Sequence, residues 1–264
     1  MAAGCMSQTD VDLWYAWIEA LSDHALRERY VGLLSAEESE QVERLVFEAD
    51  RRRGLMARAL MRTALSTYTG LPPARLRFVR DRLGKPELAE PAGAGLSFNL
   101  SHAGELVVCA VARQGSVGVD VEELGRSLDF LPLGRRFFAP SETAVLERTP
   151  PEARRRAFFE IWTLKEAYAK ARGLGLSIPL GSFAVIPAGE EPPSACFSDP
   201  SEDDPAEWRF GQVELAGRYQ LAVALRSGGR GPLGVRLRET VPLVRAVPAR
   251  ILPPNGCNRW VVQV

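Results

Sequence analysis

The spacing of apolar residues predicts strands and a long helix in the first half of the chain. Apolar side chains at every second position indicate a strand at residues 11–17, and an apolar stripe with helical spacing runs from about 50 to 68. Gly70 follows as a helix terminator. Further short strands are predicted at residues 76–78, 96–100, 106–112 and 117–122.

Two capping boxes indicate further helix starts, because a Ser or Thr side chain and a Glu three residues later can satisfy free N–H groups of the first turn. Ser35 and Glu38 form the first box, and Thr149 and Glu152 form the second, whose helix extends to Gly173. We expect the first of these helices to carry an apolar stripe of Val42, Leu45 and Val46.

The second half repeats the order of elements of the first. Strands are predicted at residues 183–186, 208–215 and 219–225, so each half passes from a helix through a Gly-Leu and Pro segment to an alternating strand. This order is by itself only a weak indication of a duplicated α/β chain.

Two segments near the C-terminus have a biased charge. Residues 188–207 contain seven acidic side chains and no basic one, and we interpret them as a solvated loop or insertion outside the chemistry. Residues 225–264 contain seven Arg and one Glu. Such a run is usually a solvated face, although it could also contact an acidic partner.

The overall composition is that of a globular protein with 46% hydrophobic and 25% charged residues, which excludes a disordered or fibrous chain. The 33 basic and 33 acidic residues balance, so no nucleic-acid or membrane partner is expected. Four Cys without a C-x-x-C pair and two His exclude a Cys/His zinc site. The start MAAGCMSQTD does not resemble a leader, and we expect a cytoplasmic protein with reduced thiols.

The lysines are few enough to be examined one by one. The 33 basic residues comprise 30 Arg and only Lys85, Lys165 and Lys170. The Arg excess agrees with a GC-rich coding sequence. An ammonium, unlike a guanidinium, is a compact charge that can meet one phosphate oxygen or transfer a proton. The three lysines are therefore candidate functional positions.

Two carboxylates lie on one face of the strand predicted at residues 117–122. Asp120 and Glu122 point to the same side, and the alternating valines point to the other. A half-exposed strand with its polar face in water explains such a pair, whereas paired carboxylates also suit Mg²⁺.

A second cluster lies on the predicted helix above Trp162, where Glu166 and Lys170 are four residues apart and Lys165 is beside them. A surface Glu–Lys pair is the simpler explanation. Two of the three lysines beside one carboxylate favour an anion site instead.

The third cluster combines Lys85, in a Gly-Lys-Pro turn, with His102, which follows Ser101 at a strand end. A turn or core role is the default for both, although loop residues often bind ligands. Arginines of the long helix could bind a phosphate or be solvated, namely Arg51, Arg52, Arg53 and Arg62. Together the clusters suit metal-assisted chemistry on a polyanion, and no P-loop or G-x-G-x-x-G accompanies them.

The ordered series GKP, FNLSHAG, VGVDVEE, FFAPSE and WTLKEAYAKARGLGLSIPL resembles the Sfp-type 4′-phosphopantetheinyl transferases over about residues 53–183. The resemblance implies two similar α/β halves about a pseudo-twofold axis, residues 1–115 and 116–264, with coenzyme A between them. It also implies transfer of the phosphopantetheine arm from coenzyme A to a serine of an apo acyl or peptidyl carrier protein, releasing adenosine 3′,5′-bisphosphate. The acidic and basic segments have no counterpart in it.

The resemblance also implies residue roles. Asp120, Glu122 and Glu166 hold Mg²⁺, with Mn²⁺ as the alternative cation. Glu166 is in addition the base, and Lys170 stabilises the departing bisphosphate beside Asp120. Coenzyme A binding falls to Arg53, Arg80, Lys85, Pro86, Ser101, His102, Asp120, Lys165 and Lys170. Glu142 in FFAPSE matches a family glutamate to which we assign no role.

The partners expected on this basis are coenzyme A and a carrier protein of fatty-acid, polyketide or nonribosomal-peptide synthesis. We expect a monomer, because one chain supplies both halves of the cleft. The alternative is a non-catalytic module on the same fold that binds coenzyme A or a carrier protein, and a third hypothesis is a Mg²⁺-dependent phosphohydrolase.

Overall fold

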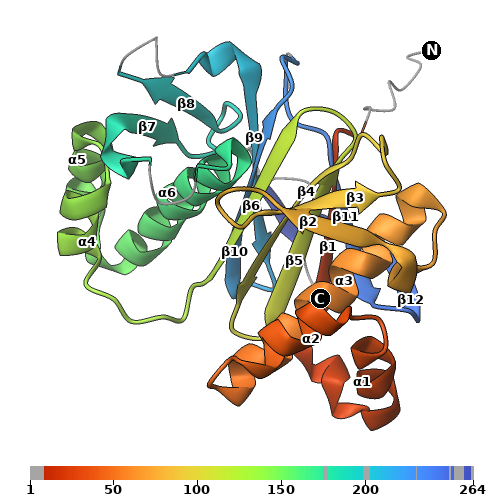
Figure 1. Cartoon of the computed structure of the whole chain (residues 1–264). Coiled ribbons are helices and arrows are strands. Elements are labelled where there is room, and N and C mark those ends of the chain that lie inside the picture. Colours follow the sequence, from red (N-terminus) through yellow and green to blue (C-terminus); the bar gives the residue numbers. More distant parts are fainter. Residues whose placement is uncertain are drawn as a thin grey trace, which may run out of the picture.

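The computed structural model describes residues 9–174, 178–198, 203–229, 231–249, 251–252 and 259–262, which form a mixed α/β fold (Figure 1). One five-stranded sheet consists of β1 (Val11–Trp17), β4 (Ser97–Ala103), β5 (Leu106–Ala112), β11 (Val235–Val241) and β12 (Arg245–Pro248), in the order β12-β11-β1-β5-β4. The other consists of β6 (Ser116–Glu123), β9 (Trp208–Leu215), β10 (Tyr219–Arg226), β13 (Ile251–Leu252) and β14 (Arg259–Val262), in the order β13-β14-β9-β10-β6.

Helices and two hairpins surround the sheets. The helices are α1 (His24–Val31), α2 (Ala36–Glu43), α3 (Glu48–Thr69), α4 (Phe130–Phe137), α5 (Pro140–Arg148) and α6 (Pro151–Arg172). The hairpins pair β2 (Arg77–Arg80) with β3 (Pro86–Glu90) and β7 (Phe183–Ile186) with β8 (Ser194–Phe197). Short 3₁₀ turns lie at Ile18–Ser22, Pro73–Arg75, Leu180–Ser182 and Pro205–Glu207. None of the described helices has the length and apolar character needed to cross a membrane.

The two halves of the chain share one topology. The first runs β1, α3, the β2–β3 hairpin, β4 and β5, and the second runs β6, α6, the β7–β8 hairpin, β9 and β10. Each half contributes three strands to its sheet, and the third strand in sequence lies between the first and the second. The resulting orders are β1-β5-β4 and β6-β10-β9. The predicted α/β class with two similar halves is confirmed. The boundary at 115/116 itself stays a prediction, since β11 and β12 return to the first sheet.

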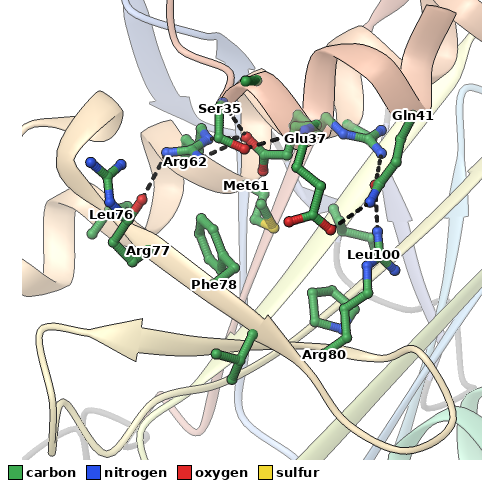
Figure 2. A pocket seen from close by; sticks show the side chains of 16 residues that line it. Ser35, Glu37, Gln41, Met61, Arg62, Leu76, Arg77, Phe78, Arg80 and Leu100 are labelled. Carbon is green, nitrogen blue, oxygen red and sulfur yellow. Dashed lines mark hydrogen bonds and ion pairs between the residues drawn. The ribbon is translucent and has the colours of Figure 1, made fainter.

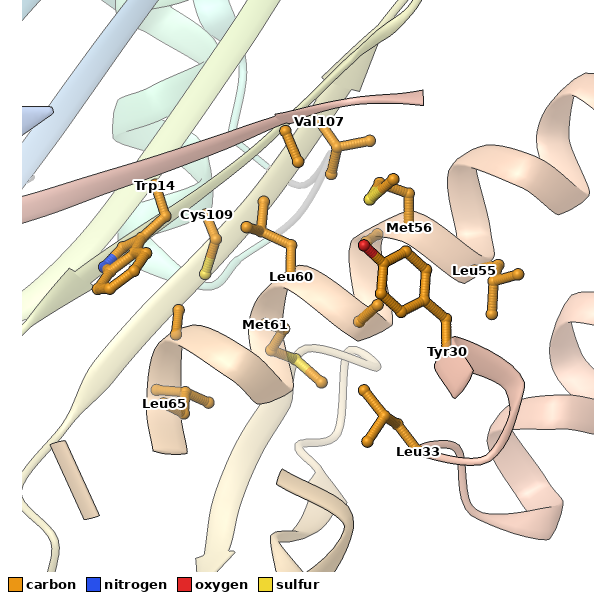
Figure 3. Packing of buried hydrophobic residues seen from close by; sticks show 14 of the residues in the cluster. Trp14, Tyr30, Leu33, Leu55, Met56, Leu60, Met61, Leu65, Val107 and Cys109 are labelled. Atoms are coloured by element: carbon orange, nitrogen blue, oxygen red, sulfur yellow. The ribbon is translucent and has the colours of Figure 1, made fainter. Parts of the chain in front are cut away.

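The sheets pack face to face between the two long helices. Alternate residues of β1 belong to different cores: Trp14 packs toward α3, as Figure 3 shows, whereas Leu13 and Tyr15 pack against the second sheet. A third core lies between the second sheet and α6. The alternation in the sequence therefore predicts a strand correctly, although both of its faces are buried.

The strands β4 and β6 lie side by side at the junction of the two sheets (Figure 1). Side chains of β4 join them, because oxygens at alternate positions accept backbone N–H groups of β6 that would otherwise be buried without a partner. The three hydrogen bonds run from Val117 N to Ser97 Oγ (3.0 Å), from Val119 N to Asn99 Oδ1 (3.0 Å) and from Val121 N to Ser101 Oγ (3.3 Å). We call this set the β4–β6 seam.

Two predictions about helix ends need correction. The Ser35–Glu38 capping box is present, but α2 ends at Glu43, so the predicted stripe continues only as far as Val42. Leu45 and Val46 lie beyond the helix, and Arg51 binds the carbonyl oxygens of both residues. Thr149 does not cap α6, because its hydroxyl donates instead to the Val145 carbonyl at the end of α5.

The acidic and basic segments are also more structured than predicted. Within residues 188–207, β8 pairs with β7, and Asp203 is buried rather than solvated. Within the basic segment, β11 lies parallel to β1, where Arg236 and Arg238 both reach the buried Asp12. These two arginines share an internal counter-ion. Arg238 is half-buried, whereas the Arg236 side chain stays exposed as expected for a solvated face.

Candidate functional site

A cavity of about 750 Å³ opens where the two halves meet. Residues of α2, α3 and β4 line it from the first half, and residues of β6 and α6 line it from the second. Six residues predicted for the site are among its lining, namely Arg80, Ser101, His102, Asp120, Glu122 and Lys170. The structure therefore brings together residues that are up to ninety positions apart in sequence.

Lys170, Asp120 and Ser101 form a connected polar group in the wall of this cavity. The Lys170 ammonium lies 2.6 Å from Asp120 Oδ1 and donates to Ser101 Oγ at 3.0 Å. The Ser101 hydroxyl donates in turn to Asp120 Oδ1 at 3.0 Å. A simple Glu166–Lys170 surface pair is excluded, because Lys170 pairs with the neighbouring strand instead.

Gly118 allows this approach of helix and strand. A Cβ atom at this position would collide with the Ala167 carbonyl oxygen and lie 2.5 Å from the Ala171 nitrogen, both in the backbone of α6. Only a residue without a side chain fits, so α6 packs directly on β6. The polar face of β6 is thus covered by a helix. The interpretation of β6 as a half-exposed strand with its polar face in water is therefore excluded. Gly118 belongs to the G-V-D-V-E motif, and our sequence interpretation missed its role.

Three carboxylates lie within electrostatic reach of one another. Burial raises the pKa of Glu166, and the charge of Asp120 raises it further. Burial and then the charge of Asp120 also raise the pKa of Glu122, whose carboxylate lies 2.7 Å from the Arg126 guanidinium. Asp120 Oδ2 is buried and has no hydrogen-bond partner. The cluster holds more negative charge than its protein neighbours satisfy.

A hard divalent cation suits this donor set, because it takes carboxylate oxygens and would satisfy Asp120 Oδ2. Among the residues that the structure describes, no three His, Cys, Asp or Glu side chains already form a metal-binding group. One oxygen of the Glu122 carboxylate is paired with the Arg126 guanidinium. The residues fit Mg²⁺ by chemistry, and they require a side-chain rotation to enclose it.

The remaining predicted residues lie around this cluster. Desolvation, followed by the charges of Arg53 and Lys170, lowers the pKa of His102, so its imidazole is neutral near pH 7. Arg53 is held by Asp50 at 2.6 Å and by the Gly104 carbonyl oxygen at 2.9 Å. The Lys85 ammonium donates to the Lys170 carbonyl oxygen at 3.1 Å and thus links the two halves.

A second cavity of about 810 Å³ adjoins the first and shares Gln41, Arg58 and Arg80 with it. Figure 2 shows its polar and apolar lining, and Pro86 is among the lining residues. The amide oxygen of Gln41 accepts from Arg58 at 3.0 Å and from Arg80 at 2.5 Å. Neither guanidinium has a carboxylate partner among the described residues. Arg58 was not predicted, because nothing in the sequence links it to Arg80.

Lys165 does not lie at either cavity, so its assignment to coenzyme A binding needs correction. Its ammonium is fully buried and lies 2.8 Å from Glu142, and it donates to the carbonyl oxygens of Leu180 and Phe183. Glu142 accepts in turn from two backbone N–H groups, those of Ala139 and Val185. Lys165 and Glu142 are therefore structural partners that bind α5 and β7 to α6.

Three helix arginines that were candidate phosphate ligands are also occupied elsewhere. Arg51 binds Glu48, and Arg52 donates to the carbonyl oxygen of Ile18. Arg62 is buried, with Glu38 accepting from it at 2.6 and 3.0 Å. The sequence alone could not show that Arg58, rather than these three arginines, faces the cavities, since all four are on one helix.

Comparison with known proteins identifies both halves. Residues 22–114 match the family model described as "4′-phosphopantetheinyl transferase, N-terminal", and residues 116–224 match "4′-phosphopantetheinyl transferase superfamily". The chain is 39% identical over 145 residues to "4′-phosphopantetheinyl transferase HetI" of Nostoc sp., a match that covers 54% of this chain and 61% of that protein.

Two Bacillus subtilis proteins extend the comparison. A "4′-phosphopantetheinyl transferase" is 34% identical over 181 residues, which cover 64% of this chain and 77% of that protein. "4′-phosphopantetheinyl transferase Sfp" is 32% identical over 158 residues, which cover 60% and 68%. With both halves matched and the polar cluster at their junction, the chain belongs to the 4′-phosphopantetheinyl transferase superfamily.

Proposed function

We propose that this protein transfers the 4′-phosphopantetheine arm of coenzyme A to a serine of an apo acyl or peptidyl carrier protein, releasing adenosine 3′,5′-bisphosphate. The observation that carries the proposal is the group of Lys170, Asp120 and Ser101 in the wall of the cavity between the halves. The relatives named as 4′-phosphopantetheinyl transferases support the same reaction.

The nucleotide end of coenzyme A is assigned to the junction of the two cavities. Arg58 and Arg80 share one neutral amide there, so their charge is available to the ribose 3′-phosphate. Lys85 and Arg53 lie nearby on the side of Lys170 and His102. The pyrophosphate then lies between this junction and Asp120, where the neutral His102 can donate one N–H to a phosphate oxygen.

The serine hydroxyl must lose its proton as its oxygen attacks phosphorus. Glu166 accepts this proton, directly or through a water molecule, and its raised pKa makes it a stronger base than an ordinary glutamate. As the new O–P bond forms, the phosphoanhydride bond of coenzyme A breaks. Lys170 meets the negative charge that develops on the departing bisphosphate, because its ammonium already lies in the cavity wall.

Asp120, Glu122 and Glu166 would hold Mg²⁺, with Mn²⁺ as the alternative. When bound, the cation neutralises charge on the pyrophosphate. Ser101 keeps the Asp120 carboxylate in place through its hydroxyl, so that Oδ2 remains directed away from Lys170. The proposal further includes a monomeric enzyme that acts in the cytoplasm, with the cleft built by one chain.

A carrier-protein panel tests the reaction and the acceptor class together. The protein is incubated with coenzyme A, Mg²⁺ and apo carriers from fatty-acid, polyketide and nonribosomal-peptide systems, and intact mass is recorded. We expect the mass of the phosphopantetheine arm on the serine of at least one carrier. No gain on any carrier rejects the transfer. Tight coenzyme A binding without product then indicates a non-catalytic module, and bisphosphate release without a carrier indicates a phosphohydrolase.

A further inference from the structure

We infer that Asp203, in the acidic segment that family resemblance leaves unexplained, is a positioning residue that fixes the last turn of α6 and with it the ammonium of Lys170. The inference rests on the proposed function, because it gives the fixed ammonium its task.

Asp203 binds the last two turns of α6 on the side of the helix that faces away from Lys170. Its carboxylate Oδ2 accepts from the Tyr168 hydroxyl at 2.9 Å and from the Arg172 guanidinium at 2.7 Å. The same guanidinium donates to the Tyr168 oxygen at 2.7 Å. The Asp203 side chain is only 2% exposed, so these bonds are shielded from water. One carboxylate of the acidic segment thus joins two residues that are one helical turn apart.

Aromatic packing holds Tyr168 in the same place. Its ring lies 4.6 Å from the ring of Phe183, 5.4 Å from that of Phe197 and 4.7 Å from that of Trp208, measured between centroids. Phe197 belongs to β8, inside the acidic segment, and Trp208 follows the last residue of the segment at the start of β9. Within the described part of the acidic segment, Phe197 and Asp203 therefore both contact α6 through Tyr168.

Lys170 reaches the site from the other side of the same turn. Two residues advance an α-helix by about 200°, so Lys170 points away from Tyr168 and Arg172 and toward Asp120. The backbone of this turn is held from that side too, because Lys85 binds the Lys170 carbonyl oxygen and the Ser116 hydroxyl binds that of Ala171. Asp203 binds the opposite side of the turn through Tyr168 and Arg172, and without these bonds the turn can shift relative to β6.

The position of the turn matters because it ends the helix. Gly173 follows in a left-handed conformation and terminates α6 only three residues after Lys170. Terminal turns have few backbone hydrogen bonds of their own and fray readily. A displacement of about 1 Å between a reacting group and its substrate can cost up to a hundredfold in rate. A side-chain clamp on this turn therefore bears directly on catalysis.

The test is a double-mutant cycle between Asp203→Asn and Lys170→Ala. Single-turnover transfer to the best carrier of the panel is measured for both single variants and the double variant. We expect Asp203→Asn to slow transfer between about tenfold and a hundredfold in the wild-type background, with little change in the KM for coenzyme A. In the Lys170→Ala background we expect less than a twofold effect, since the group being positioned is gone.

A matched control is Glu214→Gln, which removes a carboxylate from Arg156 near the start of the same helix. This control should change transfer less than twofold in both backgrounds. If Asp203→Asn slows transfer by the same factor with and without Lys170, its role is general stability and the inference is overturned. If Asp203→Asn does not fold, Tyr168→Phe removes only the hydroxyl and must show the same dependence on Lys170, with a smaller factor of two to five.

Hydrogen exchange separates this inference from the proposed function. Amide exchange of residues 168–172 is compared between the wild type and Asp203→Asn in the absence of substrate. We expect faster exchange there and unchanged exchange at the start of α6. Unchanged exchange at residues 168–172 overturns the clamp, even if the protein is an active transferase. A wild type that modifies no carrier rejects the proposed function and leaves the exchange result as a separate outcome.

Discussion

Two lysines of α6 differ sharply in their surroundings although they are five residues apart. Lys165 is fully buried, and one carboxylate and two carbonyl oxygens satisfy its ammonium. Lys170 lies at a cavity wall, where its partner Asp120 keeps one oxygen without a hydrogen bond. The two ion pairs are similar in length but differ in role. The difference is that both oxygens of Glu142 accept hydrogen bonds, whereas Asp120 keeps one oxygen without a donor.

The same contrast recurs on α3, the equivalent helix of the first half. Arg62 is buried against Glu38, whereas Arg58, one turn away, shares the neutral Gln41 with Arg80. Each long helix therefore carries a buried cation with a carboxylate partner, Lys165 or Arg62, although Arg62 also lines the second cavity. Each also carries a cation at the first cavity, Lys170 or Arg58. The predictions below test this division, in order of decreasing effect.

The largest expected effect is on the free energy of unfolding after Glu142→Ala. The change leaves the Lys165 ammonium buried without its counter-ion and frees the N–H groups of Ala139 and Val185. Removing one partner of a buried pair costs about 3–5 kcal/mol. Urea denaturation measures it. The control Glu147→Ala breaks an exposed pair with Arg135 and should cost less than about 1 kcal/mol. A stable Glu142→Ala protein without transfer activity would place Lys165 in the reaction after all.

Asp120→Asn should slow transfer by about a hundredfold to a thousandfold, because it removes the negative charge that pairs with Lys170 and that would help to hold the cation. The asparagine keeps the shape of the side chain, so circular dichroism should be unchanged. Rates are read from the mass gain of the carrier. Glu123→Gln, on the same strand but paired with Arg218, is the matched control and should remain near the wild-type rate. A near-wild-type rate for Asp120→Asn would contradict the proposed mechanism.

Arg58→Ala should raise the KM for coenzyme A by about tenfold or more, since a hydrogen bond from a charged group contributes about 1.5–3 kcal/mol. The KM for coenzyme A without the ribose 3′-phosphate should not change. Arg62→Ala should instead lower the free energy of unfolding, because Arg62 is paired with Glu38. Arg75 is exposed, and Arg75→Ala should change neither the KM for coenzyme A nor the free energy of unfolding. An equal loss of affinity for both coenzyme forms would mean that Arg58 does not bind the 3′-phosphate.

The smallest effect concerns pH and stability. Burial raises the pKa of Glu166 in the folded protein, so the folded state binds this proton more tightly than the unfolded state does. Stability should therefore increase as the pH falls through the raised pKa toward the ordinary carboxyl value of 4.5. Glu166→Gln removes the contribution of Glu166, leaves that of Glu122, and should stabilise the protein at pH 7 by about 0.5–2 kcal/mol. Thermal unfolding without Mg²⁺ at several pH values measures the effect, and a destabilised variant at pH 7 would refute it.

Much of the fold could be predicted because the apolar residues that mark a strand or helix in the sequence are the residues that the fold buries. The strands at residues 11–17, 106–112, 183–186 and 208–215 have the predicted bounds. The end of α2 could not be predicted from apolar spacing, because Arg51, at the start of α3, binds the carbonyl oxygens of Leu45 and Val46. The charge bias also gave no sign that Arg236 pairs with Asp12, which is more than two hundred residues away.

The candidate site was predictable only in part. The motif residues Asp120 and Lys170 do meet, but Lys165 was grouped with them through the rarity of lysine and the family motif. Five residues turn a helix by about 140°, so the two lysines could have been separated by geometry. No local signal marks Arg58, whose role depends on contacts with Gln41. Gly118 is part of the G-V-D-V-E motif, but its role depends on the close approach of α6.

The β4–β6 seam also protects the protein from unwanted association. An exposed row of backbone N–H groups on an edge strand is a template for pairing with another chain. Here the Ser97, Asn99 and Ser101 side chains occupy that row on β6. Because short polar side chains form these bonds, a foreign strand would have to displace all three to extend the second sheet. The edge that carries Asp120 is thus closed to aggregation.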